Sequence, residues 1–151
     1  ELNRNNVRLE AIGQIWRLPE AVQEQLAKTR AALAKNNGLT LILALSYGGR
    51  TELIEATRAI AEKVKSGALD PAEINERVVS EHLYTRHWPD PDLMIRTSGE
   101  MRISNFLLWQ AAYAELFFTD DLWPDFKPER LRDALTWFAG RDRRFGSSAP
   151  L

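Results

Sequence analysis

Apolar residues along the chain follow two periods, and the shorter period marks four strands. Residues 7–12 alternate between apolar and charged side chains, which predicts a short strand. Residues 39–45 are apolar almost without interruption, a pattern typical of a strand that is buried on both faces of a parallel sheet. Two further short runs, 93–95 and 115–118, predict the remaining strands.

The longer, helical period appears between these strands. Apolar side chains recur every three or four residues after Pro19, and again over about residues 51–65. Asp70 predicts another helix start, because it is followed by a proline and, three residues after the cap, by a glutamate. Two later helices are predicted, one at 105–113 and one marked by Leu131, Leu135 and Phe138 that ends near 143–146.

Strands and helices therefore alternate, with a loop at 87–91 where two prolines lie close together. This order predicts an α/β fold with a mostly parallel β-sheet flanked by helices. The sequence contains no repeat, low-complexity tract or internal linker. We therefore expect residues 1–151 to belong to a single domain.

Composition narrows the functional classes. The 151 residues carry a net charge of −1 and are 44% hydrophobic, as expected for a soluble globular domain without a basic surface for nucleic acid. The absence of cysteine excludes disulfides and thiol catalysis. The longest apolar run, 39–45, is too short to span a bilayer, and no signal-like segment occurs. The chain opens at Glu1 rather than at a methionine, which favours a piece of a longer protein.

Two predicted strands end in unusual polar segments, and ligands of parallel α/β sheets bind at such ends. The first segment, Ser46-Tyr47-Gly48-Gly49-Arg50, leads into a predicted helix. Paired glycines at a helix start can expose backbone N–H groups to an anion. On these residues alone, a tight strand-to-helix turn is the favoured interpretation.

The second segment, residues 95–105, combines two arginines with three hydroxyls, an amide and a glycine. Arg96 and Arg102 have the planar fork that binds phosphate oxygens, and Ser104 is expected to begin a helix whose free N–H groups favour an anion. The set is suited to a diphosphate. The alternative is a solvated loop in which Ser104 is an ordinary N-cap and Glu100 pairs with an arginine. Both interpretations remain open at this point.

Other polar side chains carry less information. Glu115 begins a predicted strand and offers a hard oxygen ligand for magnesium, but on this residue alone an exposed strand-end position is the favoured interpretation. The acidic run Asp120–Asp125 contains Pro124 and is interpreted as a turn. His82 and His87 have no metal-ligand spacing with other donors.

Longer motifs identify a family. Residues 96–110 read Arg-Thr-Ser-Gly-Glu-Met-Arg-Ile-Ser-Asn-Phe-Leu-Leu-Trp-Gln, which is a long and highly specific run. Three shorter segments accompany it, namely Ala-Leu-Ser-Tyr-Gly-Gly-Arg at 44–50, Ala-Tyr-Ala-Glu-Leu at 112–116 and Trp-Pro-Asp-Phe at 123–126. Together they resemble the cis-prenyltransferases, the family that includes undecaprenyl diphosphate synthase. The resemblance covers essentially the whole chain.

The resemblance implies an isoprenyl transferase that condenses isopentenyl diphosphate with an allylic prenyl diphosphate. The product would be a cis-polyprenyl diphosphate such as undecaprenyl diphosphate, the lipid carrier for cell-wall synthesis. Glu115 falls on the position of the family's magnesium ligand, so Mg²⁺ is the implied cofactor. The implied isopentenyl diphosphate positions are Arg96, Glu100, Arg102, Ile103 and Ser104.

The resemblance also implies a homodimer. Arg144 and Gly146 match the Arg-x-Gly motif that reaches across the dimer to the partner's diphosphate site. A basic residue that pairs with the dipole at a helix end is the alternative for Arg144. Release of a long-chain product implies transient contact with a membrane surface, and hence a cytoplasmic location at the membrane periphery.

One family signature is absent. The run His-x-x-x-x-Met-Asp-Gly-Asn-Gly-Arg binds the allylic diphosphate and supplies the catalytic aspartate, and in family order it precedes Glu1. The Phe-Ser-x-x-Asn-Trp-x-Arg-like segment of the mobile lid is also absent from residues 1–151. We therefore expect the amino-terminal portion of the domain to be supplied by further upstream chain or by a second polypeptide. The isolated piece is expected to be inactive.

Two other functions compete with this one. A non-catalytic partner subunit would lend only its Arg-x-Gly tail to a catalytic subunit. A generic anion-binding α/β module would bind phosphate without any prenyl chemistry. Detection of the Asp-Gly-Asn-Gly-Arg run upstream of Glu1 would favour the enzyme.

Overall fold

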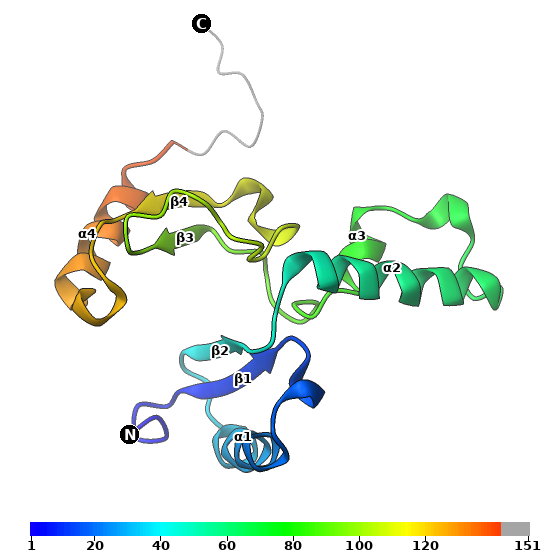
Figure 1. Ribbon diagram of the computed structural model, residues 1–151, viewed down its shortest axis with the longest axis horizontal. Helices are drawn as coiled ribbons and strands as arrows, with labels where there is room; N and C mark the ends of the chain where they lie inside the picture. Colours follow the sequence, from blue (N-terminus) through cyan, green and yellow to red (C-terminus); the bar gives the residue numbers. More distant parts are fainter. Residues whose placement is uncertain (143–151) are drawn as a thin grey trace, which may run out of the picture. The chain divides into compact units, whose positions relative to one another are not determined.

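The computed structural model describes residues 1–142 and divides the chain into two compact units, Glu1–Trp88 and Pro89–Leu151. Each unit contains one pair of parallel strands with helices beside it (Figure 1). The predicted α/β class is therefore confirmed. The prediction of a single domain over the whole chain stays a prediction.

The first unit begins with a β-α-β arrangement. Strand β1 (Arg8–Ile12) pairs in parallel with β2 (Thr40–Ala44), so that Leu9 lies opposite Leu41. Helix α1 (Glu20–Leu33) connects them, after a short 3-10 helix at Ile15–Arg17, and packs against β1. The turn after β1 requires Gly13, because its φ of +104° is left-handed and a Cβ atom there would lie 2.2 Å from the Leu45 carbonyl oxygen.

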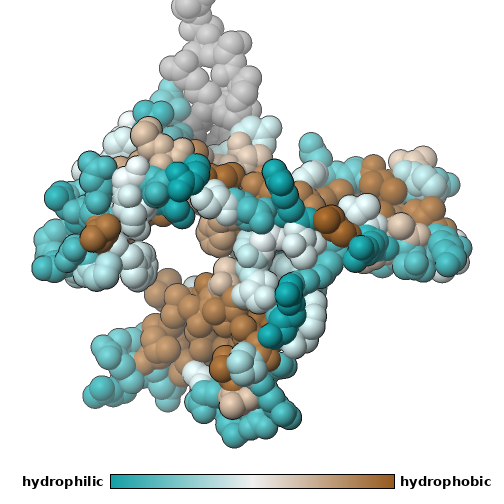
Figure 2. Space-filling model, viewed as in Figure 1, coloured by the Kyte–Doolittle hydropathy of each residue, from teal (hydrophilic) through white to brown (hydrophobic). Residues whose placement is uncertain are grey.

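The prediction that β2 is buried on both faces is wrong. Leu39, Leu41 and Leu43 remain 69%, 38% and 36% exposed. Within residues 1–142, β2 pairs with β1 alone, and hydrophobic surface gathers over these two strands (Figure 2). A strand with one neighbour has an unpaired edge. The apolar side chains of β2 are typical of a strand buried on both faces, but residues 1–142 leave Leu41 and Leu43 exposed to solvent.

The rest of the first unit is helical. Helix α2 (Gly49–Lys65) follows β2 directly, as predicted, and Gly67 with a φ of +73° follows its end. At Asp70 both hydrogen bonds of the predicted capping box form, but they start only a 3-10 turn, Pro71–Glu73. The next α-helix, α3 (Glu76–Ser80), begins at an Asn75 N-cap instead.

The second unit contains β3 (Leu93–Arg96) and β4 (Glu115–Phe118), which are paired in parallel, and helix α4 (Pro128–Ala139). Short 3-10 helices lie at Gln110–Tyr113 and Trp123–Asp125. The predicted end of the last helix is too late, because α4 ends at Ala139. None of the helices in residues 1–142 has both the length and the apolarity needed to cross a bilayer.

The predicted helix at 105–113 is wrong over most of its length. Ser104, Asn105 and Leu107 adopt φ values of +46°, +66° and +47°, and regular helix appears only at Gln110–Tyr113. A left-handed residue directs its peptide groups away from the right-handed hydrogen-bond ladder, so three of them prevent an α-helix here. Ser104 consequently begins no helix and is no N-cap.

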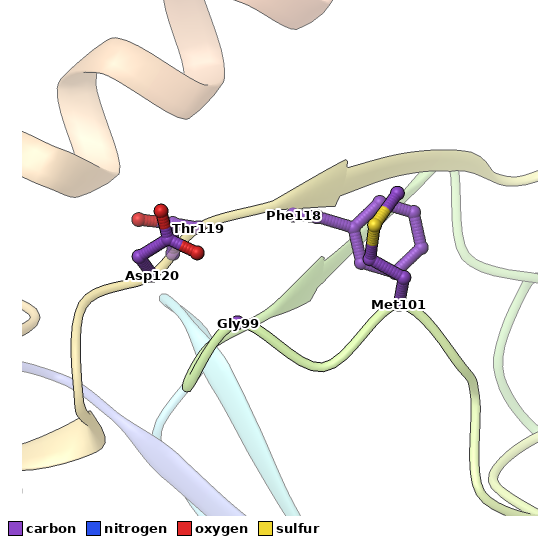
Figure 3. Close-up of a pocket in the computed structure, with 5 residues that line it drawn as sticks. All are labelled: Gly99, Met101, Phe118, Thr119 and Asp120. Carbon is purple, nitrogen blue, oxygen red and sulfur yellow. The ribbon is translucent and has the colours of Figure 1, made fainter.

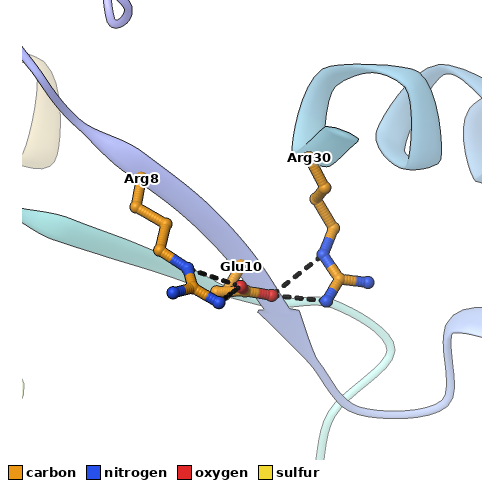
Figure 4. Close-up of polar contacts among 3 residues, drawn as sticks. All are labelled: Arg8, Glu10 and Arg30. Carbon is orange, nitrogen blue, oxygen red and sulfur yellow. Dashed lines mark hydrogen bonds and ion pairs between the residues drawn. The ribbon is translucent and has the colours of Figure 1, made fainter. Parts of the chain in front are cut away.

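A buried acid links β1 to α1. Glu10 is only 7% exposed, and its carboxylate accepts hydrogen bonds from Arg8 Nε at 2.9 Å and from Arg30 Nε at 3.0 Å (Figure 4). Burial raises the pKa of Glu10, but the hydrogen bonds and charges of Arg30 and Arg8 outweigh it, so the pKa lies below its ordinary value of 4.5.

This arrangement makes stability depend on pH. We expect Glu10→Gln to lower the free energy of unfolding by about 1–2 kcal/mol at pH 7, because two half-exposed guanidiniums lose their charged acceptor. Since the folded pKa is the lower one, the stabilisation is complete above pH 4.5 and is lost as the pH falls through the folded pKa. Urea unfolding at pH 7 and at about pH 3 measures this difference.

The exposed pair between Glu24 and Lys28 on α1 supplies the control. Glu24→Gln should change the free energy of unfolding by less than about 0.5 kcal/mol at either pH. An equal loss of stability in Glu10→Gln at both pH values would contradict the electrostatic explanation.

Candidate functional site

Arg96 is the last residue of β3, and the polar loop that follows it is held against the end of β4. Thr119 N donates to the Arg96 carbonyl oxygen at 3.0 Å, and Gly99 N donates to the Thr119 carbonyl oxygen at 3.0 Å. Ser98 N donates to the Asp121 carbonyl oxygen at 2.8 Å. The loop turns through two left-handed residues, Ser98 and Gly99, with φ values of +70° and +67°. It is therefore an ordered turn rather than a loose surface loop.

The Arg96 side chain is half-buried, and one of its N–H donors lacks an acceptor among the described residues. Its Nε atom is buried and has no hydrogen-bond partner in the part of the chain that is described. A buried N–H donor without an acceptor is costly, and the cost is greater for a charged group. An anionic ligand at this position would remove that cost.

The rest of the predicted diphosphate segment is more open. Arg102 is exposed, and its guanidinium forms an ion pair with Glu100, as one interpretation of the sequence expected. Ile103 is half-buried, whereas Ser104 is exposed. The case for an anion at a helix start near Ser104 is lost with the helix. The Ser104 hydroxyl remains an available donor in a turn.

A cavity of about 430 Å³ lies beside this loop, within the second unit. Figure 3 shows the residues that line it, which come from the loop and from the end of β4, namely Gly99, Met101, Phe118, Thr119 and Asp120. Met101 and Phe118 supply the apolar part of the lining, and Gly99, Thr119 and the Asp120 carboxylate supply the polar part. The cavity thus combines polar and apolar walls, as a site for a small amphipathic ligand requires.

Glu115 lies away from Arg96 on the same strand pair. In the register of β3 and β4, Glu115 is opposite Leu93 and Phe118 is opposite Arg96. Three residues of strand span about 10 Å, and side chains alternate between faces, so Glu115 and Phe118 point to opposite faces. The strand pair therefore does not bring Glu115 beside Arg96 within one chain.

Trp137 of α4 and Arg141, just beyond the end of that helix, contact residues on the face that carries Glu115. The Glu115 carboxylate, 20% exposed, accepts a hydrogen bond from Arg141 Nε at 3.1 Å, and the Arg141 guanidinium lies 5.2 Å from the centre of the Trp137 ring. Phe117, on the same face, meets Trp137 edge to face at 5.4 Å. As a hard, partly exposed oxygen donor, Glu115 fits magnesium, with Arg141 as a competitor for the carboxylate.

Magnesium commonly takes one or two protein carboxylates together with substrate phosphate. Within residues 1–142, no three acidic or histidine side chains gather closely enough to hold a metal ion. Glu115 would therefore need further ligands from a substrate or from residues outside this part of the chain.

The glycine-rich segment after β2 is a tight turn into α2. Gly48 is the extended N-cap of α2, and Ser46 is left-handed with a φ of +46°. Glu52, in the first turn of α2, is 2% exposed and accepts hydrogen bonds from Tyr47 Oη at 2.5 Å and from Tyr84 N at 2.8 Å. These bonds favour the strand-to-helix turn that the sequence predicted.

Two polar groups were missed by the sequence analysis. The first is the cluster around Tyr84, whose hydroxyl donates to Glu55, and burial together with the Glu55 carboxylate raises the pKa of Tyr84. The second is Asp121, which the sequence placed in a simple turn but which contacts the Arg96 loop and α4. No spacing rule predicts either group, because the partners are distant in sequence.

The Arg144 and Gly146 positions lie outside the described residues.

Comparison with known proteins places these features in one family. The family model described as "Putative undecaprenyl diphosphate synthase" matches residues 1–146. An isoprenyl transferase of Porphyromonas gingivalis is 54% identical over 149 residues, which are 99% of this chain and 59% of the relative. A ditrans,polycis-undecaprenyl-diphosphate synthase of Vibrio cholerae, specific for (2E,6E)-farnesyl diphosphate, is 48% identical over 97% of this chain and 58% of its own length.

Solved structures agree with these relatives. The lavandulyl diphosphate synthase of Lavandula x intermedia, in complex with dimethylallyl diphosphate, has a TM-score of 0.91 and 43% identity over 93% of this chain and 61% of that chain. A probable undecaprenyl diphosphate synthase of Campylobacter jejuni has a TM-score of 0.83 and 35% identity over 97% and 66%. The chain thus spans about three fifths of its curated relatives. Since the family model covers nearly all of it, the chain belongs to the undecaprenyl diphosphate synthase family of cis-prenyltransferases.

Proposed function

We propose that this chain is the carboxy-terminal part of an enzyme that condenses isopentenyl diphosphate with an allylic prenyl diphosphate. The product would be a cis-polyprenyl diphosphate such as undecaprenyl diphosphate. The observation that carries the proposal is the half-buried Arg96 at the end of β3, whose Nε lacks an acceptor among residues 1–142 and whose carbonyl oxygen helps to order the loop that follows. Both diphosphates named for the relatives are allylic, which supports an allylic co-substrate.

In the proposed reaction, the allylic substrate loses diphosphate at C1, and the double bond of isopentenyl diphosphate attacks that carbon. A proton then leaves, and a new cis double bond results. Arg96 would hold the diphosphate of isopentenyl diphosphate, which does not react, so that the double bond faces the allylic carbon. Arg102 and Ser104, which are both exposed, would bind further oxygens of the same diphosphate. The ion pair with Glu100 would orient the Arg102 guanidinium.

Glu115 is proposed as a magnesium ligand on the basis of its carboxylate chemistry and its family position. A bound magnesium ion would neutralise negative charge on the diphosphates. Because Glu115 and Arg96 point to opposite faces of the β3–β4 pair, an ion held by Glu115 would not lie beside a diphosphate held by Arg96 within one chain. Its other ligands would come from the substrate and from the amino-terminal part of the domain.

The apolar groove on the first unit is a candidate wall for the growing isoprenoid chain. It has a volume of about 390 Å³ and is lined mainly by aliphatic side chains of β1, β2 and α1, including Leu9, Val22, Leu26 and Leu43. An isoprenoid chain is a hydrocarbon, and its burial on such a surface is favourable by the hydrophobic effect. The upstream part of the domain would supply the opposite wall.

We propose further that the enzyme is a cytoplasmic homodimer at the membrane periphery.

The test joins this chain to the amino-terminal part of the Porphyromonas gingivalis isoprenyl transferase, which restores the family's full length. With an allylic starter and magnesium, the chimera should incorporate labelled isopentenyl diphosphate into butanol-extractable lipid. The same incorporation by this chain alone would contradict the expected inactivity of the piece. Failure of a folded chimera would sink the catalytic proposal and favour the non-catalytic partner or the generic anion-binding module.

A further inference from the structure

The turn after β4, residues 119–121, is hydrogen-bonded to the loop that follows Arg96. Residues 119–121 receive two backbone hydrogen bonds from the Arg96 loop, from Gly99 N and Ser98 N, and return one from Thr119 N to the Arg96 carbonyl oxygen. The loop and the turn are thus joined on both sides of the left-handed residue Ser98. A non-glycine residue in this conformation is strained, and it persists because its surroundings hold it.

The turn is itself fixed by the Asp121 side chain. Its carboxylate accepts a hydrogen bond from Thr119 Oγ1 at 2.5 Å, and Thr119 Oγ1 in turn accepts from Asp121 N at 3.3 Å. The same carboxylate oxygen, Oδ2, lies 3.2 Å from Arg130 Nε in the first turn of α4. Arg130 also lies 3.3 Å from Asp133, so it remains in contact with its own helix. A continuous set of polar contacts therefore runs from α4 through Asp121 and Thr119 to the loop.

We propose that Asp121 and Arg130 are positioning residues for isopentenyl diphosphate, an inference that rests on the proposed function of the Arg96 loop. Neither residue lines the cavity beside the loop. They act by keeping the turn in the shape that accepts the Ser98 and Gly99 N–H groups. When the contact with α4 is lost, the loop is ordered in a smaller fraction of molecules, and the apparent affinity falls by that fraction.

The test uses the complete chimeric enzyme and measures both Michaelis constants. Asp121→Ala should raise the KM for isopentenyl diphosphate about five- to twentyfold, while kcat and the KM for the allylic substrate stay within about twofold. Asp121→Asn keeps an oxygen for Thr119 but loses the charge that pairs with Arg130, so it should raise the same KM only two- to fivefold, roughly. Arg130→Ala should match Asp121→Asn, and adding it to Asp121→Ala should change nothing further.

Arg132→Ala is the matched control, because Arg132 is an exposed arginine on the same helix whose partner is Glu129. It should leave both Michaelis constants unchanged. A wholly structural role would lower the melting temperature and the active fraction without separating the two Michaelis constants. If Asp121→Ala does not fold, Arg130→Ala and Asp121→Asn carry the test.

The inference is overturned if the KM for isopentenyl diphosphate is unchanged in the variants that fold, or if both Michaelis constants rise together. An unsubstituted chimera that folds but incorporates no isopentenyl diphosphate would instead sink the proposed function. An active chimera with an unaffected Asp121 variant leaves that function intact and removes only the positioning role.

Discussion

Arg96→Ala is expected to raise the KM for isopentenyl diphosphate by about 10- to 150-fold in the complete enzyme, the loss of one hydrogen bond to a charged group. Each hydrogen bond between charged groups contributes about 1.5–3 kcal/mol, and every 1.4 kcal/mol is a factor of ten in affinity. Because the diphosphate that Arg96 is proposed to hold does not react, the loss would fall equally on ground state and transition state. The value of kcat should therefore stay within about threefold, and steady-state kinetics with saturating allylic substrate measures both constants.

Companion variants define the role of the half-buried Arg96 guanidinium. Arg96→Lys should recover little of the loss, because an ammonium group cannot form the two parallel bonds of the guanidinium fork. Arg102→Ala should raise the same KM less, since Arg102 is exposed and already shares its charge with Glu100. Arg77→Ala removes an exposed arginine of α3 that pairs with Glu81, and it should have no effect. Unchanged kinetics in both Arg96→Ala and Arg102→Ala would refute the assignment.

Glu115→Gln is expected to raise the magnesium concentration required for half-maximal activity by about tenfold or more. An amide oxygen is a neutral and weaker ligand for a hard cation than a carboxylate, so the variant keeps the shape of the side chain but loses affinity for the ion. Titration of activity with magnesium at saturating substrates measures the shift. A shift in the titration would show that Glu115 takes part in magnesium binding even though the strand register separates it from Arg96.

Arg141→Ala is the matched variant, because Arg141 is the partner that now holds the Glu115 carboxylate at 3.1 Å. If Glu115 binds magnesium, removal of this competitor should leave the magnesium requirement unchanged or lower it. If Glu115 serves only to pair with Arg141, both variants should lower the melting temperature alike and neither should shift the magnesium titration. That result would remove Glu115 from the proposed metal site.

The strands could be predicted because their patterns are local. The alternation at 7–12 and the short runs before Arg96 and after Glu115 gave β1, β3 and β4 close to their observed bounds. The helix at 105–113 could not be excluded in this way. Its residues suit a helix one by one, and the left-handed conformations of Ser104, Asn105 and Leu107 have no signal in their residue types, since only Asn favours that region.

Some features of the candidate site could likewise be predicted from the sequence, and others could not. The sequence located the arginines and hydroxyls of the 95–105 segment, because the chemistry of phosphate binding depends on residue type. It did not predict that the Arg96 Nε is buried, that Asp121 connects the loop to α4, or that Glu115 faces away from Arg96. These facts depend on which strands pair and in which register.

By itself, the sequence determined the α/β class, the family and the residue types that can bind a diphosphate, because periodicity and motif are carried by neighbouring residues. Only the tertiary structure decided which of those residues share a face and a neighbour. The pairing of β3 with β4 sets Arg96 and Glu115 on opposite faces, and a hydrogen-bonded turn brings Asp121 to the loop. Such contacts join residues separated by twenty or so positions along the chain, and no local pattern encodes distances of that kind.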